Sequence, residues 1–228
     1  MATYVLIHGA WHGAWCWDFV KPELEKEGHK VITPNLPIDT EATLIDYAKF
    51  VVNEIDEEWD PIVVGHSMAG LLLPLIAENT IVRRLVYLCA VLRRAGCSLA
   101  EDHEDGVNPG LTIPGFEQIK VDENDGFSSL KKEAMPYFYA DCTEEIQKWA
   151  FSNLRKQHSY WKEENPQEEW PEVSSASIIC TEDKAIDPHW SEQVARDWLN
   201  VRPITLSASH SPFLSHPKKL AEILLKEI

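Results

Sequence analysis

The sequence lacks any long apolar run, and for its length it is poor in basic residues. No run of apolar residues approaches the roughly 18 needed to span a bilayer, and no charged-then-apolar signal segment opens the chain. Lys and Arg number 21 against 37 Asp and Glu, so the formal net charge is -16. Nucleic acid and anionic membranes select for clustered Lys and Arg, which argues against both as partners. We therefore expect a soluble, cytoplasmic protein.

Cysteine is scarce, and its spacing forms no recognisable motif. The five cysteines are odd in number and scattered, with no CxxC pair and no histidine at metal-binding spacing: Cys16, Cys89, Cys97, Cys142 and Cys180. We expect buried or inert free thiols that pack as small hydrophobic side chains, and no metal site.

Internal repeats and low-complexity tracts are also missing, and short apolar runs alternate instead with segments of helical spacing. With 228 residues and 44% hydrophobic composition, the chain is long enough for one sizeable core. The repeated alternation of strands and helices predicts an α/β fold with a mostly parallel sheet flanked by helices. The expected strands are residues 4–7, 30–33, 62–64, 85–88, 176–180 and 203–206, and the expected helices between and after them are 43–52, 190–199 and 218–228.

The alternation stops near residue 93 and resumes near residue 171. The block between is acidic and rich in Gly and Pro at first, and then has aromatic helical stretches at 135–139 and 144–154. It is too long for an ordinary loop, so we expect it to fold over the sheet as an inserted helical cap. The predicted domains are a core of residues 1–93 and 171–228 and a cap of residues 94–170.

The stretch GHSMAG at residues 65–70 follows an apolar run and places Ser67 among small residues. A nucleophilic serine needs a sharp strand-to-helix turn with small neighbours, and the usual pattern for it is G-x-S-x-G. Here Ala69 stands where that pattern has glycine, and Gly70 follows one position later. Small residues also let a strand and a helix pack closely, so the stretch alone leaves open whether Ser67 is reactive.

Backbone N–H groups on both sides of Ser67 are suited to bind an oxyanion. The N–H of Met68 lies at the start of the expected helix, where unpaired N–H groups favour negative charge. The stretch HGAWHG at residues 8–13 follows the first strand, and a second oxyanion donor comes from this place in such sites. We predict that this donor is the N–H of Ala10, at a turn that Gly9 permits.

A base and an orienting acid are expected downstream, each directly after a strand. His210 follows the strand at 203–206, and Asp183 follows the strand at 176–180. In a parallel sheet both would lie at the edge that Ser67 occupies. Glu182 and Asp187 compete with Asp183 for the role of the acid, and Asp187 also suits a helix cap; we favour Asp183.

Four motifs together resemble the α/β-hydrolases, in the branch of small bacterial carboxylesterases related to plant methylesterases and hydroxynitrile lyases. The motifs are HGAWHGAWCW at 8–17, GHSMAG at 65–70, CTEDKAI at 180–186 and SHSPFLSHP at 209–217, and the cap stretch at 137–155 is similar to that of the bacterial esterases. The resemblance implies Ser67 as nucleophile, His210 as base and Asp183 as acid. It also implies the N–H groups of Ala10 and Met68 as the oxyanion hole. The family often has a glycine-rich turn after the second strand; this chain has NLPID at 35–39 instead, so the family's substrates do not carry over.

The expected activity is serine carboxylesterase hydrolysis through an acyl-enzyme on Ser67, with no cofactor and no metal. Aromatic side chains predict an apolar pocket: Trp11, Phe138, Tyr139 and Trp149. A small to medium hydrophobic ester is the expected small-molecule partner, and a second copy of the chain in a homodimer is left open.

Two other activities compete with the esterase hypothesis. A hydroxynitrile lyase uses the same fold, but the lyases of this branch carry a lysine after the histidine, where this chain has Ser211. A small-molecule receptor also remains an alternative, because a hydrolase fold does not fix function.

Overall fold

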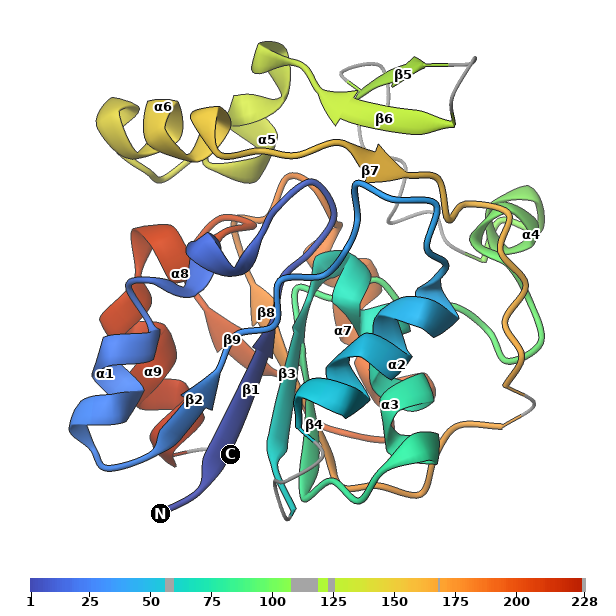
Figure 1. Ribbon diagram of the computed structural model, residues 1–228, viewed down its shortest axis with the longest axis horizontal. Helices are drawn as coiled ribbons and strands as arrows, with labels where there is room; N and C mark the ends of the chain where they lie inside the picture. Colours follow the sequence, from blue (N-terminus) through green and yellow to red (C-terminus); the bar gives the residue numbers. More distant parts are fainter. Residues whose placement is uncertain (56–59, 108–118, 123–125, 168, 227–228) are drawn as a thin grey trace.

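A computed structural model describes residues 1–55, 60–107, 119–122, 126–167 and 169–226 (Figure 1). Its largest layer is a six-stranded sheet in the order β2-β1-β3-β4-β8-β9, in which every neighbouring pair is parallel. The strands are β1 (Thr3–Ile7), β2 (Lys30–Ile32), β3 (Ile62–His66), β4 (Arg84–Leu88), β8 (Ser175–Cys180) and β9 (Ile204–Leu206). Because the strands are parallel, their carboxyl ends meet at one edge of the sheet.

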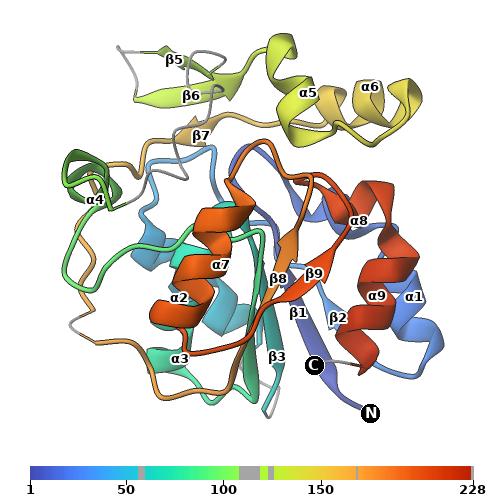
Figure 2. The same ribbon diagram turned by 180° about the vertical axis from the view of Figure 1, so that it is seen from behind.

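Alternate residues of each strand face two separate apolar cores, as the pleat of a strand requires. Leu6 and Val64 belong to one core, whereas Val5 and Val63 belong to the other. Helices α1 (Lys21–Lys26), α8 (Pro212–Ser215) and α9 (Pro217–Lys226) pack in the first core, and α2 (Leu44–Glu54), α3 (Leu73–Asn79) and α7 (Pro188–Asp197) pack in the second (Figures 1 and 2). The predicted fold class, a mostly parallel sheet flanked by helices, is confirmed.

Polar residues fix the starts of two of these helices. The Thr43 hydroxyl accepts from the N–H of Asp46, whose carboxylate accepts from the N–H of Thr43 in return, so a capping box begins α2. Asp187 begins α7 by accepting from the N–H of His189 at 2.9 Å. A cap of this kind stabilises a helix by about 0.5–2 kcal/mol.

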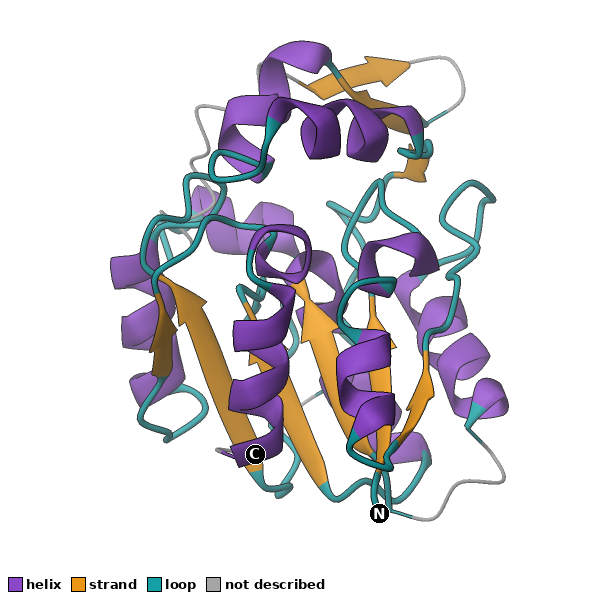
Figure 3. Ribbon diagram, turned by 90° about the vertical axis from the view of Figure 1, so that its left-hand side faces the viewer, coloured by secondary structure: helices purple, strands orange, loops and turns teal. Residues whose placement is uncertain are grey.

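The segment between β4 and β8 lies across the carboxyl ends of the large sheet (Figure 3). It contains the predicted helices, α5 (Met135–Phe138) and α6 (Glu144–Ser152), together with α4 (Leu99–Glu104). It also contains a small antiparallel sheet, β5 (Ile119–Asp122), β6 (Phe127–Leu130) and β7 (Gln157–His158), which the sequence pattern did not predict. β7 has two residues, too few for an alternation of apolar and polar side chains to show.

The domain boundaries at residues 93/94 and 170/171 stay a prediction. Residues 108–118, 123–125 and 168 of the expected cap lie outside the described residues, as do 227–228 of the expected last helix. Within the described ranges, no helix has both the length and the apolar character needed to cross a membrane.

Candidate active site

Ser67 lies in a sharp turn between β3 and α3. Its φ is 52°, in the left-handed region, which costs a non-glycine residue about 1–3 kcal/mol and is concentrated at functional sites. The N–H of Val91 donates to the Ser67 carbonyl at 2.9 Å and ties the turn to the end of β4. A Cβ at Gly70 would lie 2.5 Å from the Val91 carbonyl oxygen, so glycine is required there. Ala69 is fully buried, which shows that the turn accommodates its methyl group.

The predicted base and acid meet where β8 and β9 end. The Nδ1 atom of His210 lies 2.8 Å from the Asp183 carboxylate, and both side chains are buried. The second oxygen of Asp183 accepts from the N–H groups of Ala185 at 2.7 Å and Ile186 at 2.9 Å. Because a carboxylate can only accept, Nδ1 of His210 carries the proton and Nε2 is left as an acceptor. This is the tautomer that a general base requires.

The two competing acids have other partners. The Asp187 carboxylate begins α7, as described above, and Glu182 accepts from the hydroxyl of Ser207 at 2.7 Å in an exposed position. Among the described residues, the carboxylate that contacts the His210 ring is therefore that of Asp183.

The loop after β1 brings Ala10 beside Ser67. A Cβ at Gly9 would lie 2.9 Å from the Ser67 Cβ, so only glycine allows this approach. Nδ1 of His8 donates to the Gly9 carbonyl at 2.9 Å, and Nδ1 of His12 donates to the Ala10 carbonyl at 2.8 Å. Burial lowers the pKa of His8 to about 3 and that of His12 to about 4, so both rings are neutral donors at pH 7.

The second predicted oxyanion donor, Met68, is buried immediately after the Ser67 turn. Its N–H lies in the first turn of a short helix (Ser67–Leu71), where backbone N–H groups have no intrahelical acceptor. Ala10, in the loop after β1, and Met68, in the short helix after β3, thus lie on either side of Ser67.

A cavity of about 570 Å³ opens over Ser67 and His210. Its size suits a ligand of drug-like dimensions. Most of its lining is apolar or aromatic, with polar groups from β6 and β7. The lining residues are Ala10, Trp11, Ser67, Val91, Leu99, His103, Ser128, Phe138, Gln157, His158, Ser159, Tyr160, Trp161, Ala185, Ile186 and His210.

The structure places two of the four predicted pocket aromatics on the cavity wall. Trp11 and Phe138 line it, with ring centroids 6.0 Å apart. Tyr139 is fully buried, and its hydroxyl lies 2.7 Å from Nε2 of His12. Trp149 packs edge-on against Trp15 at 5.1 Å. Neither Tyr139 nor Trp149 is among the described residues that line the cavity.

Comparison with known proteins identifies the family. A model described as "Alpha/beta hydrolase family" matches residues 4–223. The chain belongs to this family. Among solved structures, polyneuridine aldehyde esterase superposes on this alpha/beta hydrolase with a TM-score of 0.86, covering 100% of this chain and 99% of that chain at 22% identity, which shows the shared fold.

Curated relatives include both bacterial and plant proteins. The chain is 34% identical over 141 residues to the carbendazim hydrolyzing esterase of Nocardioides sp. (strain SG-4G), but the match spans 55% of this chain and only 58% of that protein. Methylesterase 7 of Arabidopsis thaliana is 26% identical over 251 residues, with 98% and 95% coverage. Alpha-hydroxynitrile lyase of the same plant is 28% identical over 250 residues, with 97% and 95% coverage. The predicted family relationship is confirmed.

Several cavity residues of this alpha/beta hydrolase were missed by the sequence analysis, and they come from the region between β4 and β8. Leu99 and His103 lie on α4, and Ser128, Gln157 and His158 lie on β6 and β7. The motifs that mark strand ends do not occur there, so the sequence carries no signal for which side chains face Ser67.

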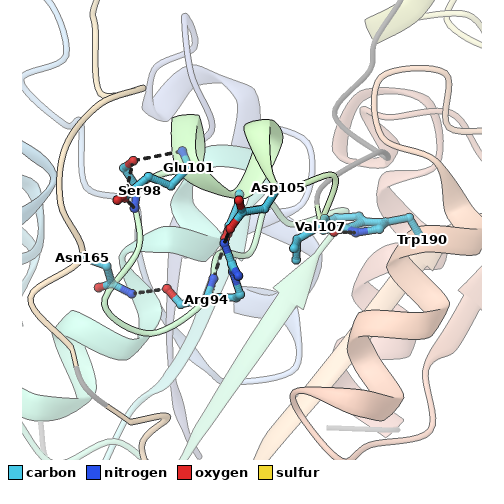
Figure 4. Close-up of polar contacts among 8 residues, drawn as sticks. Arg94, Ser98, Glu101, Asp105, Val107, Asn165 and Trp190 are labelled. Atoms are coloured by element: carbon cyan, nitrogen blue, oxygen red, sulfur yellow. Dashed lines mark hydrogen bonds and ion pairs between the residues drawn. The ribbon is translucent and has the colours of Figure 1, made fainter.

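Polar contacts at both ends of α4 hold its cavity-lining face in place (Figure 4). Ser98 and Glu101 form a capping box at its start. At its end, Asp105 pairs with Arg94 at 2.6 Å, and the amide of Asn165 donates to the Arg94 carbonyl at 3.1 Å. Trp190 on α7 donates its indole N–H to the carbonyl of Val107 at 3.2 Å, which joins this region to the core.

Cys89 is a further neighbour of the acid and base that the sequence did not indicate. Its sulfur, a carboxylate oxygen of Asp183 and a ring nitrogen of His210 lie within 4.8 Å of one another, a donor set that could hold a metal ion. Cys89 follows β4 with a φ of 43° and is buried. Burial raises the pKa of its thiol, so the group is protonated at pH 7.

Proposed function

We propose that the chain is a serine carboxylesterase that cleaves hydrophobic esters through an acyl-enzyme on Ser67. The observation that carries the proposal is the hydrogen bond of 2.8 Å between His210 and Asp183, in a site where His210 and Ser67 line one cavity. This bond leaves Nε2 of His210 ready to take a proton on the cavity side.

In the proposed mechanism, Nε2 of His210 takes the hydroxyl proton of Ser67 as Ser67 attacks the ester carbonyl. The N–H groups of Ala10 and Met68 bind the oxyanion that forms. The intermediate collapses, the alcohol leaves with the proton from His210, and the acyl group stays on Ser67. Water, activated by His210, then attacks the acyl-enzyme and releases the acid. Asp183 holds the ring and stabilises the imidazolium in both steps.

The relatives support an ester substrate, and the cavity favours one of moderate size. The carbendazim hydrolyzing esterase and methylesterase 7 are named as esterases. A cavity of about 570 Å³ with Leu99, Phe138 and Trp161 in its wall favours aromatic or branched esters over very small ones. The position after His210, where a lyase of this branch would carry lysine, holds the buried and uncharged Ser211.

A hydrolysis assay on aryl esters, with labelling by a serine-reactive phosphonate, tests the proposal. The wild-type protein should hydrolyse the esters and acquire one phosphonate adduct, located at Ser67 by peptide mass spectrometry. Ser67→Ala should lose both, with residual turnover lower by about five or six decades, as for removal of a serine nucleophile.

Ser152→Ala is the matched control, because its hydroxyl binds the Trp149 carbonyl at 2.7 Å in an exposed position of α6. It should keep both turnover and labelling. Full activity in Ser67→Ala, or a wild-type protein that neither turns over nor labels, would overturn the proposal. Saturable binding of an apolar ester without turnover would favour the receptor alternative.

A further inference from the structure

A carboxylate from the region between β4 and β8 accepts hydrogen bonds from the loop that carries His210. Asp141 lies in the turn between α5 and α6, and the loop runs from the end of β9 to the start of α8 (Figure 2). Asp141 accepts from the N–H of Ser209 at 2.9 Å and from the Ser209 hydroxyl in a short hydrogen bond. His216, just before α9, places Nδ1 3.3 Å from the same carboxylate. Asp141 thus binds the residue immediately before His210.

The charge and the burial of these groups indicate a strong contact. Ser209 is fully buried, and the Asp141 side chain is 18% exposed. Burial acts to raise the pKa of Asp141, but hydrogen bonds, first those from Ser209 and then one from the Ser215 hydroxyl, together outweigh it, and the pKa lies below its ordinary value. Asp141 is therefore ionised at pH 7, and hydrogen bonds to an ionised acceptor are about twice as strong as neutral ones.

A buried core residue, His66, forms a hydrogen bond with the same loop on its other side. Nε2 of His66 lies 2.9 Å from the carbonyl oxygen of His210, and because a carbonyl can only accept, Nε2 is the donor. His66 is fully buried at the end of β3, directly before Ser67. The backbone around His210 is therefore fixed at Ser209 N–H by Asp141 and at His210 C=O by His66, and the ring itself is fixed by Asp183.

We propose that Asp141 is a positioning residue for His210, which couples the placement of α5 and α6 to the geometry of the base. The inference rests on the proposed function, because it assumes that His210 takes the proton of Ser67. Asp141 acts through the Ser209 N–H and hydroxyl, and it does not itself touch the substrate. Without the charge on Asp141, the hydrogen bonds from Ser209 are weakened to those of a neutral acceptor, and the position of the His210 Cα is held less firmly.

Proton transfer between Ser67 and His210 is sensitive to this position. A displacement of about 1 Å in a reacting group can cost about a hundredfold in rate, and sites are held within roughly 0.5 Å by supporting contacts. Binding of the ester depends instead on the cavity wall, to which Asp141 does not contribute. The loss of Asp141 should therefore lower kcat and leave KM nearly unchanged.

Steady-state kinetics of Asp141→Asn test the inference. We expect kcat to fall about ten- to a hundredfold with KM within about twofold, and the phosphonate to label Ser67 correspondingly more slowly. Glu144→Gln is the matched control from the start of α6, where an exposed carboxylate pairs with Lys148 at 3.3 Å. It should leave kcat, KM and labelling unchanged.

A double-mutant cycle with Ser209→Ala measures how much of the effect passes through the Ser209 hydroxyl. Asp141→Asn in the Ser209→Ala background should lower kcat by a smaller factor than in the wild type, and the remaining loss reports the hydrogen bond from the N–H of residue 209, which alanine retains. The far-downfield proton resonance of the His210 Nδ1–H should broaden or shift in Asp141→Asn and persist in Glu144→Gln.

The outcomes distinguish the two proposals. A wild-type protein without esterase activity would contradict the proposed function, independently of the result for Asp141→Asn. An active wild type with unchanged kcat and an unchanged His210 resonance in Asp141→Asn overturns the positioning role alone. A variant that only melts at lower temperature, with kcat and KM retained, also overturns it and makes Asp141 a structural contact.

Discussion

At the scale of single residues, the sharpest distinction is between two aspartates four positions apart. Asp183 accepts from His210 and from two backbone N–H groups, whereas Asp187 accepts from the N–H of His189 at the start of α7. Asp183→Asn should lower kcat by about four decades, because an amide at this position favours the wrong tautomer of the base. Steady-state turnover of an aryl ester measures the loss.

Asp187→Asn is the control for this change, since asparagine caps a helix as well as aspartate does. It should leave both turnover and thermal stability unchanged, while Asp187→Ala should cost about 1 kcal/mol in the free energy of unfolding. If turnover survived in Asp183→Asn and fell in Asp187→Asn, the acid would be Asp187.

At the scale of elements, the stability of the strand–turn–helix unit around Ser67 depends on having glycine at position 70. A Cβ at Gly70 would meet the Val91 carbonyl at 2.5 Å and the Ala90 Cβ at 2.7 Å. Gly70→Ala should therefore force the turn away from the end of β4 and cost about 1–3 kcal/mol in the free energy of unfolding. Urea denaturation measures the stability, and phosphonate labelling should slow as Ser67 moves.

Ala69→Gly is the companion change at the position where the usual motif has glycine. It removes a buried methyl group and adds backbone freedom, so we expect a loss of about 1 kcal/mol with the turn and the labelling rate preserved. A more stable Ala69→Gly variant, or a Gly70→Ala variant as stable as the wild type, would contradict this account of the turn.

The elements also show how far the sequence predicts the site. Ser67, Asp183 and His210 each follow a strand of a parallel sheet, and the topology alone brings such positions to one edge. Gln157 and His158 lie on a strand of two residues, where no periodicity can show which side chain faces the cavity. Tyr139 was expected in the pocket, but its hydroxyl faces His12 in the interior. Side-chain direction there depends on packing against another loop, which no local pattern encodes.

At the scale of the whole molecule, three buried histidines around the site make folding sensitive to acid. Burial lowers the pKa of His8 to about 3 and of His12 to about 4, and it holds the pKa of His66 well below its ordinary value. In the unfolded chain these rings titrate near 6.5. Below that pH the unfolded state binds more protons than the folded state, so stability falls as the pH falls.

His8 and His12 should each cost about 2 kcal/mol between pH 7 and pH 5, His66 adds to the loss in the same direction, and the loss should continue toward the folded-state pKa values. Urea denaturation at the two pH values measures it. Acid also relieves the repulsion within a chain of net charge -16. This effect stabilises the folded state and is screened by salt, so the histidine effect should persist at high ionic strength.

His12→Gln should be less stable at pH 7 but should lose about 2 kcal/mol less than the wild type on acidification. Equal stability of the wild type at pH 7 and pH 5 in high salt would show that the buried rings are protonated in the folded state, and the neutral donors assigned to the Ala10 loop would then be wrong.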